Sequence, residues 1–193
     1  MHILGFHFIF TAYGFWLPND PRGSWSTAVR SFNLQAFGPA TKVNTTRSVA
    51  STPHDHRARN NAKSALKNPP VRFNGHQALA IAQGYKKAIE EHAYTLHALT
   101  ILPDHTHIIM AWHIKPVDEI AAHLKAKATR SLTDKHLHPF ENEDKRPSPW
   151  ARSYWCPFIK NADHMRQAIN YVNQNPIKAG LPAQHWRFIK PYK

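Results

Sequence analysis

The sequence predicts an α+β fold: a ferredoxin-like (RRM-like) sheet of four antiparallel strands, two helices packed on it, and a C-terminal helix that carries a tyrosine. The main observation is the order of the apolar patterns, β–α–β–β–α–β–α, whose first six elements form the split βαβ arrangement. The second is the length, because 193 residues can bury a core of their own. The third is the single cysteine, Cys156, which excludes a disulfide framework.

The first half of this pattern consists of a strand, a helix and a hairpin. Residues 2–13 are rich in Phe and Ile that alternate loosely, as in a buried strand. From Gly75 the apolar residues follow the spacing of an amphipathic helix of about four turns. Two apolar runs, 94–102 and 105–114, flank the turn at 103–104, which is the signature of a hairpin.

The second half supplies two helices and the fourth strand. Residues 116–132 place their apolar side chains on one stripe, with proline suitably in the first turn. Residues 150–159 are expected to form the fourth strand. Asn161 is positioned to cap the last helix. That helix should end near Asn175, because the residue before a proline disfavours the α conformation, and Pro176 follows.

We expect one domain over residues 1–193, with a basic insertion at about 18–74. Between Asp20 and Asn74 there are nine Lys or Arg and two acids. A structureless loop of this length is uncommon inside a compact domain. The segment therefore either carries short helices, with 56–67 as a candidate, or forms a mobile basic arm. A disordered, solvated insertion is the alternative.

The charge of the chain points to a polyanionic partner. Twenty-five Lys and Arg against 12 acids give a formal net charge of +13, and such an excess is typical of nucleic-acid binding. A cationic membrane-surface protein is the other interpretation, but no basic amphipathic helix is long enough to support it. No stretch approaches the roughly 20 apolar residues of a membrane span, so no membrane partner is expected. The apolar N-terminus lacks a basic start and a cleavage site, which indicates a strand rather than a signal peptide. A cytoplasmic location fits these features.

The sharpest local signal is the pair His105 and His107. In a strand, residues i and i+2 point to the same face, roughly 6.6 Å apart. Two imidazoles so placed can share one metal ion. With 15 histidines in the chain, a purely structural pair remains the alternative.

A second signal is the pair Tyr171 and Asn175 on the last predicted helix. Their i, i+4 spacing puts both side chains on one helix face. A tyrosine hydroxyl can act as a covalent nucleophile. The alternative is a core tyrosine followed by an asparagine at the helix end.

Together these signals resemble a known family. His105 and His107, after Leu102-Pro103-Asp104, resemble the HUH motif of single-strand DNA transposases with one catalytic tyrosine. Four further segments are similar to REP-associated tyrosine transposases: 11–24, 124–132, 154–155 and 169–181. The resemblance covers about residues 2–24 and 75–181. One departure is Thr106, because the middle residue of the motif is normally bulky and hydrophobic.

The resemblance implies a metal-dependent transposase or nickase. His105, His107 and Asn175 would bind one divalent ion, Mg or Mn. Tyr171 would attack a phosphodiester of single-stranded or hairpin DNA, giving a 5′-phosphotyrosine intermediate and a free 3′-hydroxyl. Gln174 is the fallback third ligand.

Partners follow from the same resemblance and from the basic charge. Arg22, Lys125 and Arg130 are the expected DNA contacts, with solvated surface charge as the alternative for each. A homodimer and an association with the bacterial nucleoid are also expected. The rival function is a non-catalytic nucleic-acid-binding module, or an inactive domesticated relative of the transposases.

Overall fold

The computed structural model describes residues 2–15, 17–20, 32–40 and 54–193. The chain divides into two compact units, one made of Met1–Ala12 and Arg72–Lys193, the other of Tyr13–Val71. The expectation of one domain with an insertion at about 18–74 stays a prediction.

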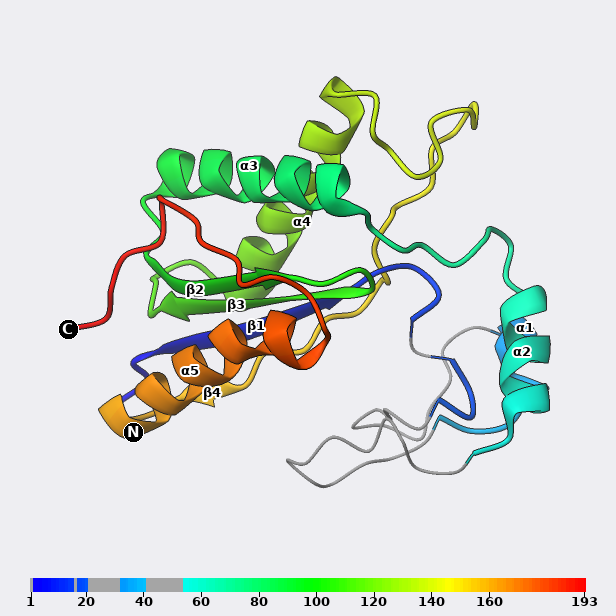
Figure 1. Cartoon of the computed structure of the whole chain (residues 1–193), viewed down its shortest axis with the longest axis horizontal. Helices are drawn as coiled ribbons and strands as arrows, with labels where there is room; N and C mark the ends of the chain where they lie inside the picture. Colours follow the sequence, from blue (N-terminus) through cyan, green and yellow to red (C-terminus); the bar gives the residue numbers. More distant parts are fainter. Residues whose placement is uncertain (1, 16, 21–31, 41–53) are drawn as a thin grey trace. The chain divides into compact units, whose positions relative to one another are not determined.

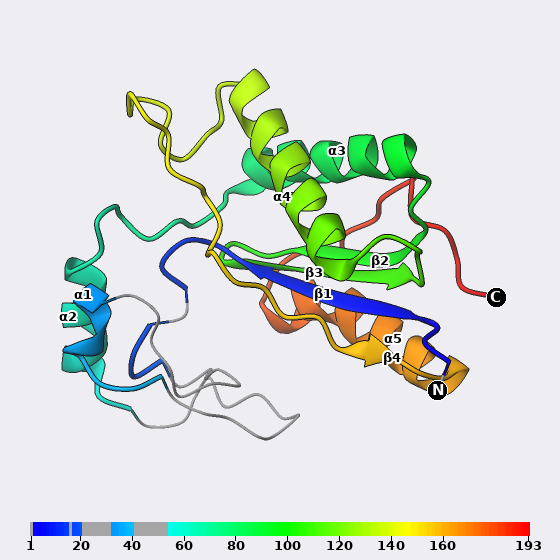
Figure 2. The same cartoon turned by 180° about the vertical axis from the view of Figure 1, so that it is seen from behind.

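The first unit has the predicted α+β fold. Its elements are β1 (Gly5–Thr11), α3 (Gly75–His92), β2 (Leu96–Ile101), β3 (His105–Ala111), α4 (Val117–Asp134), β4 (Phe158–Ile159) and α5 (Ala162–Lys178). The strands pair in the order β2-β3-β1-β4, and every pair is antiparallel. Helices α3 and α4 cover one face of the sheet and α5 lies along the other (Figures 1 and 2). The sheet is therefore covered by helices on both faces.

Alternation along β1 sends its side chains to two different cores. Phe6, Phe8 and Phe10 are buried, and the Phe10 ring contacts the ring of Tyr85 on α3. The residues between them face α5. The core under α5 is formed by Ala98, Ile109, Ile159, Met165, Ala168 and Val172. His7 belongs to this second face, which also carries the candidate site.

Side-chain caps define where the long helices begin. The Asn74 side chain accepts a hydrogen bond from the Gln77 backbone N–H at 2.9 Å, and the Gln77 side chain accepts one from the Asn74 N–H at 2.9 Å. This capping box starts α3 at the predicted Gly75. The predicted cap of the last helix is also confirmed, because the Asn161 side chain accepts from the His164 N–H at 2.8 Å.

Helices α3 and α4 approach each other closely at Gly84. A Cβ atom on Gly84 would lie 2.5 Å from the carbonyl oxygen of Lys127 and 2.6 Å from the Cα atom of Ala128. Both obstacles are backbone atoms, which cannot rotate away. Glycine is therefore required at this crossing.

The prediction of a strand over 150–159 is largely wrong. Only Phe158–Ile159 form β4. Upstream, isolated bridges join Trp155 to Ile9 of β1 and Trp150 to Ala12, the residue after β1. Pro157 has no N–H group for a ladder hydrogen bond, so regular pairing is interrupted beside β4.

The prediction that α5 ends near Asn175 is also wrong, because the helix continues through Pro176 to Lys178. A proline has no N–H group, so the carbonyl of Val172, four residues earlier, loses its helical donor. The hydroxyl of Thr100 replaces that donor, at 2.6 Å from the Val172 oxygen. The helix therefore tolerates the proline without a buried unpaired carbonyl.

The second unit contains α1 (Phe32–Gln35) and α2 (His56–Ser64), which confirms the short helix expected within 56–67. Leu17, Leu34 and Ala62 form a buried apolar cluster in this unit. Asp20 is buried too, and its carboxylate lies 3.4 Å from the Arg59 guanidinium. The described part of this unit thus has a small core and an ion pair of its own.

Candidate functional site

Strand β3 carries His105 and His107 on the face that α5 covers. Their ring centroids are 4.9 Å apart and their planes are inclined by 80°. His107 is only 4% exposed, whereas 22% of the His105 side chain is accessible. The two imidazoles are thus adjacent on one face, with His105 nearer to solvent.

Tyr171 on α5 lies against this pair. The centroid of its ring is 5.6 Å from that of His107, and the two planes are nearly perpendicular at 87°. Even so, 46% of Tyr171 is exposed. The phenol is therefore held beside the histidines and is open to a substrate.

Asn175 lies one helical turn after Tyr171, about 6 Å along the axis, on the same face of α5. Its side-chain amide nitrogen is buried and has no hydrogen-bond partner. The nitrogen and oxygen of a carboxamide exchange positions when the group turns by 180°. An amide oxygen in that buried place suits a hard divalent cation. Gln174, in contrast, is exposed, so the helix phase favours Asn175 as a ligand.

Both histidines have their Nδ1 atoms engaged. The Nδ1 of His105 lies 2.7 Å from the carboxylate Oδ1 of Asp104, and the Nδ1 of His107 lies 2.9 Å from the Nε2 of His7. Metal-ligating histidines commonly donate their other ring N–H to such partners. These contacts at Nδ1 suit ligation of a metal through Nε2. The residues present therefore fit one divalent metal ion.

Sequence reasoning missed two residues of this site, Asp104 beside His105 and His7 beside His107. In the register of the sheet, Ile9 is opposite His107, so His7 is its diagonal neighbour. The signal that could have found it is a single imidazole in a strand otherwise built of Phe and Ile.

Burial keeps the inner histidines neutral. It lowers the pKa of His107 well below the ordinary value, and the nearby His105 and His7 lower it further. Burial also lowers the pKa of His7 to about 4, with a smaller contribution from His164 on α5. Neutral imidazole is the form that binds metal ions.

Thr106, the departure from the HUH pattern, points to the opposite face and has a partner there. It is fully buried, and its hydroxyl lies 3.2 Å from that of Tyr85 on α3. Burial raises the pKa of the Tyr85 phenol. The Thr106 hydroxyl thus pairs with a buried hydroxyl on α3. The face of β3 that carries His105 and His107 is unaffected.

Lys125, which is predicted to contact DNA, forms hydrogen bonds within the protein. Its ammonium donates to the carbonyl oxygens of Ala151, at 2.9 Å, and Ser153, at 3.1 Å, and lies 5.3 Å from the ring centroid of Phe10. Burial lowers its pKa to about 8. Lys125 therefore holds the segment before β4 against the sheet.

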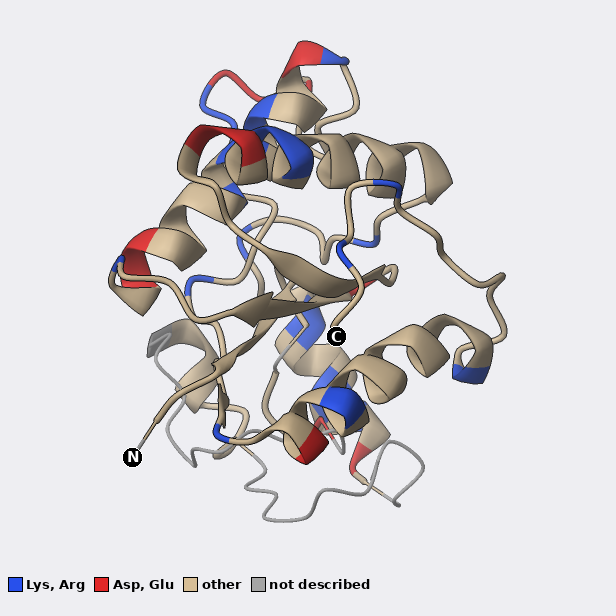
Figure 3. Ribbon diagram, turned by 90° about the vertical axis from the view of Figure 1, so that its left-hand side faces the viewer, with Lys and Arg blue, Asp and Glu red and all other residues tan. Residues whose placement is uncertain are grey.

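Of the other two predicted DNA contacts, Arg130 is exposed on α4, 3.3 Å from the Asp134 carboxylate, and Arg22 lies outside the described residues. Lys and Arg also occur on α3, α5 and the C-terminal segment (Figure 3), so charge alone does not select one face. None of the helices in the described ranges combines the length and hydropathy that crossing a membrane requires.

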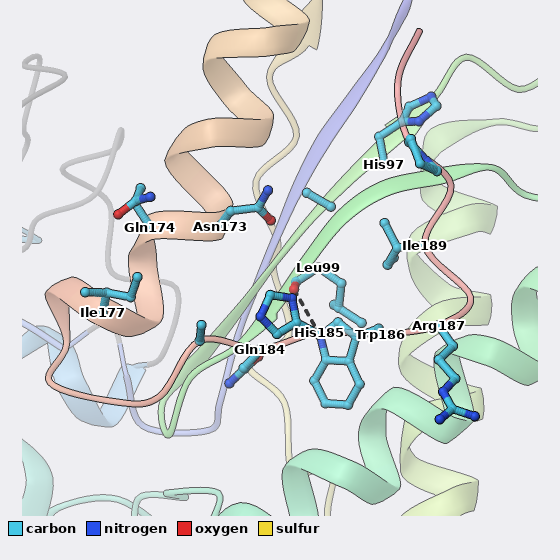
Figure 4. Close-up of a pocket in the computed structure, with 13 residues that line it drawn as sticks. His97, Leu99, Asn173, Gln174, Ile177, Gln184, His185, Trp186, Arg187 and Ile189 are labelled. Carbon is cyan, nitrogen blue, oxygen red and sulfur yellow. Dashed lines mark hydrogen bonds between the residues drawn. The ribbon is translucent and has the colours of Figure 1, made fainter.

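The C-terminal segment after α5 packs along β2. A pocket of about 580 Å³ is lined by this segment, by β2 and by the last turns of α5 (Figure 4). The Gln184 side chain bonds both backbone groups of Ile101 at 2.8 Å, and the Trp186 indole donates to the Leu99 carbonyl at 3.1 Å. The segment therefore protects the outer edge of β2.

This chain is similar to known proteins in sequence and in fold. A Haemophilus influenzae protein with the provisional name REP-associated tyrosine transposase is 30% identical over 101 residues, which are 50% of this chain and 57% of that protein. The chain thus spans little more than half the length of this relative. A solved REP-associated tyrosine transposase, bound to a REP hairpin, has a TM-score of 0.50 at 14% identity, over 97% of this chain and 76% of that one. A transposase from Deinococcus radiodurans, also provisionally named, has a TM-score of 0.44 at 13% identity, over 95% of each chain.

The family match covers the candidate site. Residues 66–175 match the family described as Transposase IS200-like. This span is more than half of the chain, and it contains His105, His107, Tyr171 and Asn175. The chain therefore belongs to the IS200-like transposase family.

Proposed function

We propose that this protein nicks and rejoins single-stranded or hairpin DNA through a covalent bond to Tyr171. The observation that carries the proposal is the half-exposed phenol of Tyr171 beside His107, with its ring 5.6 Å away. A nucleophile, two candidate metal ligands and their partners meet on one face of one sheet. The hairpin bound by the solved relative supports the same class of substrate.

His105, His107 and Asn175 would hold one Mg²⁺ or Mn²⁺ ion. When bound, such an ion polarises the scissile phosphodiester and neutralises charge on its oxygens. Asp104 would orient the imidazole of His105 by its contact with Nδ1, and His7 would do the same for His107.

Tyr171 acts as the nucleophile. Its Oη forms a bond to phosphorus while the bond from phosphorus to the 3′-oxygen breaks. The phenol loses its proton and the leaving 3′-oxygen gains one. Because one phosphodiester replaces another, a 3′-hydroxyl can later attack the tyrosyl phosphodiester without ATP. The ammonium of Lys178, 5.6 Å from the Tyr171 ring centroid, favours the negative charge that develops there.

One chain supplies both the tyrosine and the histidines in this arrangement, so cleavage within a single protomer is the expected mode. Arg130 and Arg22 remain proposed phosphate contacts, and the expected homodimer also remains a proposal. DNA as the partner implies a cytoplasmic, nucleoid-associated location.

The test uses labelled single strands and hairpins that copy the palindromes beside the gene, with Mg²⁺ or Mn²⁺, analysed on a denaturing gel. Wild-type protein should give a labelled protein–DNA adduct. Tyr171→Phe and His105→Ala should give none, while the matched control Tyr192→Phe should react normally. If wild-type protein binds these hairpins and never forms an adduct, the proposal fails and a non-catalytic binding module is favoured.

A further inference from the structure

A second group of metal-ligating side chains lies on the other face of the sheet, where α3 ends beside α4. Glu91 and His92 are the last residues of α3, and His123 is on α4. One ligand atom of each lies within 4.8 Å of the other two. Because α5 with Tyr171 covers the opposite face (Figures 1 and 2), this group is separate from the proposed cleavage site.

We propose that Glu91, His92 and His123 bind a zinc ion that joins α3 to α4. Two imidazoles, one carboxylate and an open fourth position for water are a donor set that zinc accepts in proteins. Imidazole nitrogens favour zinc over Mg²⁺, which prefers oxygen ligands. The same chemistry distinguishes this site from a Mg²⁺ or Mn²⁺ site at His105 and His107.

The three side chains are close to the required positions. The Nε2 of His123 lies 2.9 Å from the Oε2 of Glu91, and the ring centroids of His92 and His123 are 4.4 Å apart. Ligand atoms of a tetrahedral zinc ion with bonds of about 2.0–2.2 Å lie about 3.3–3.6 Å apart. The hydrogen-bonded pair of Glu91 and His123 would therefore have to separate slightly to admit the ion. The Glu91 side chain is 44% exposed, so it can rotate to make this adjustment.

In metal sites, neighbouring groups usually orient each ligand through a hydrogen bond to its other polar atom, and the neighbours of Glu91 and His123 are placed to do so. The hydroxyl of Tyr94 lies 3.4 Å from the Nδ1 of His123, which leaves Nε2 for the metal. The ammonium of Lys127 lies 2.5 Å from the Oε1 of Glu91, which leaves Oε2. Tyr94 is 1% exposed and its ring contacts those of His92 and His123. Partners of this kind typically affect metal affinity 10- to 100-fold.

The same contacts could instead be an ion-pair network with no metal, and zinc titration separates the two. The protein for the test is full-length His105→Ala/His107→Ala, freed of metal with a chelator, so that the proposed cleavage site contributes no zinc binding. Isothermal titration with zinc chloride should show one equivalent bound, and zinc should raise the melting temperature. Adding His123→Ala should weaken binding about tenfold or more and abolish the thermal shift.

Two further variants make the result decisive. Glu91→Gln keeps the shape of the side chain and should weaken zinc binding even if His123→Ala does not fold. His136→Ala removes an exposed histidine elsewhere and should leave zinc binding unchanged. The proposal is overturned if the starting variant binds no zinc, or if binding persists undiminished in Glu91→Gln. Neither outcome depends on whether the protein cleaves DNA.

Discussion

The hydroxyl of Thr100 on β2 donates a 2.6 Å hydrogen bond to the backbone carbonyl of Val172 on α5. Thr100 is 1% exposed, so this bond is shielded from water. It compensates for the N–H group that Pro176 lacks, and it ties α5 to the sheet at the residue next to Tyr171. The position of the nucleophile beside the histidines thus depends on a contact between β2 and α5.

Thr100→Val should therefore destabilise the protein by about 1–3 kcal/mol, because the Val172 carbonyl is left buried without a donor. Pro176→Ala returns the helical N–H group to that carbonyl. In the double variant the cost of Thr100→Val should be smaller, and the coupling energy from a double-mutant cycle in urea should show this. Additive effects of the two substitutions would contradict the account.

Gly84→Ala should destabilise the protein by about 1–3 kcal/mol, since the new Cβ meets backbone atoms of α4. Gly75→Ala is the matched control, because nothing lies within 4 Å of a Cβ at that position. Urea denaturation of both variants measures the difference. Equal stabilities would show that α3 and α4 are not packed as closely as described.

His7→Phe should weaken Mn²⁺ binding about 10- to 100-fold while the fold is kept, because the Nδ1 of His107 loses its partner. Titration calorimetry with Mn²⁺ measures the affinity, and circular dichroism checks the fold. His136→Ala, which removes an exposed imidazole, should bind Mn²⁺ normally. Unchanged affinity in His7→Phe would remove His7 from the site.

The low pKa of His7 predicts acid sensitivity of the metal-free protein. The unfolded chain takes up a proton near pH 6.5, whereas folded His7 resists protonation until about pH 4. The free energy of unfolding therefore falls as the pH drops from 6.5 toward 4, because only the unfolded chain takes up this proton. The loss due to His7 is about 3 kcal/mol in total. Urea denaturation of wild type and His7→Phe at pH 7.5 and pH 4.5 should show the larger loss in wild type. Parallel losses would contradict the assignment.

Local patterns predicted most of the fold, and contacts between distant residues decided the rest. The i, i+2 spacing of His105 and His107 determines a shared face from the strand geometry alone. The partnership of His7 with His107 depends on strand register, which no local pattern encodes. The end of α5 escapes prediction for the same reason. The helix tolerates Pro176 because Thr100, far away in the sequence, supplies the missing hydrogen-bond donor.

The predicted strand over 150–159 failed in a similar way. Its apolar and aromatic residues suit a strand, but the carbonyls of Ala151 and Ser153 accept hydrogen bonds from Lys125. A side chain on α4 takes the place of a neighbouring strand there. Composition could not distinguish these two partners.

The identity of the residue that carries DNA after cleavage tests the central claim most directly. Trypsin releases Tyr171 in the peptide spanning residues 167–178, which contains no other tyrosine. After reaction with a hairpin substrate and nuclease trimming, mass spectrometry should find this peptide enlarged by a nucleotide 5′-phosphate on Tyr171. Tyr154 should stay unmodified, because its hydroxyl donates to the Asp118 carboxylate and its pKa is raised by burial. A nucleotide on any other residue, with Tyr171 unmodified, would contradict the account.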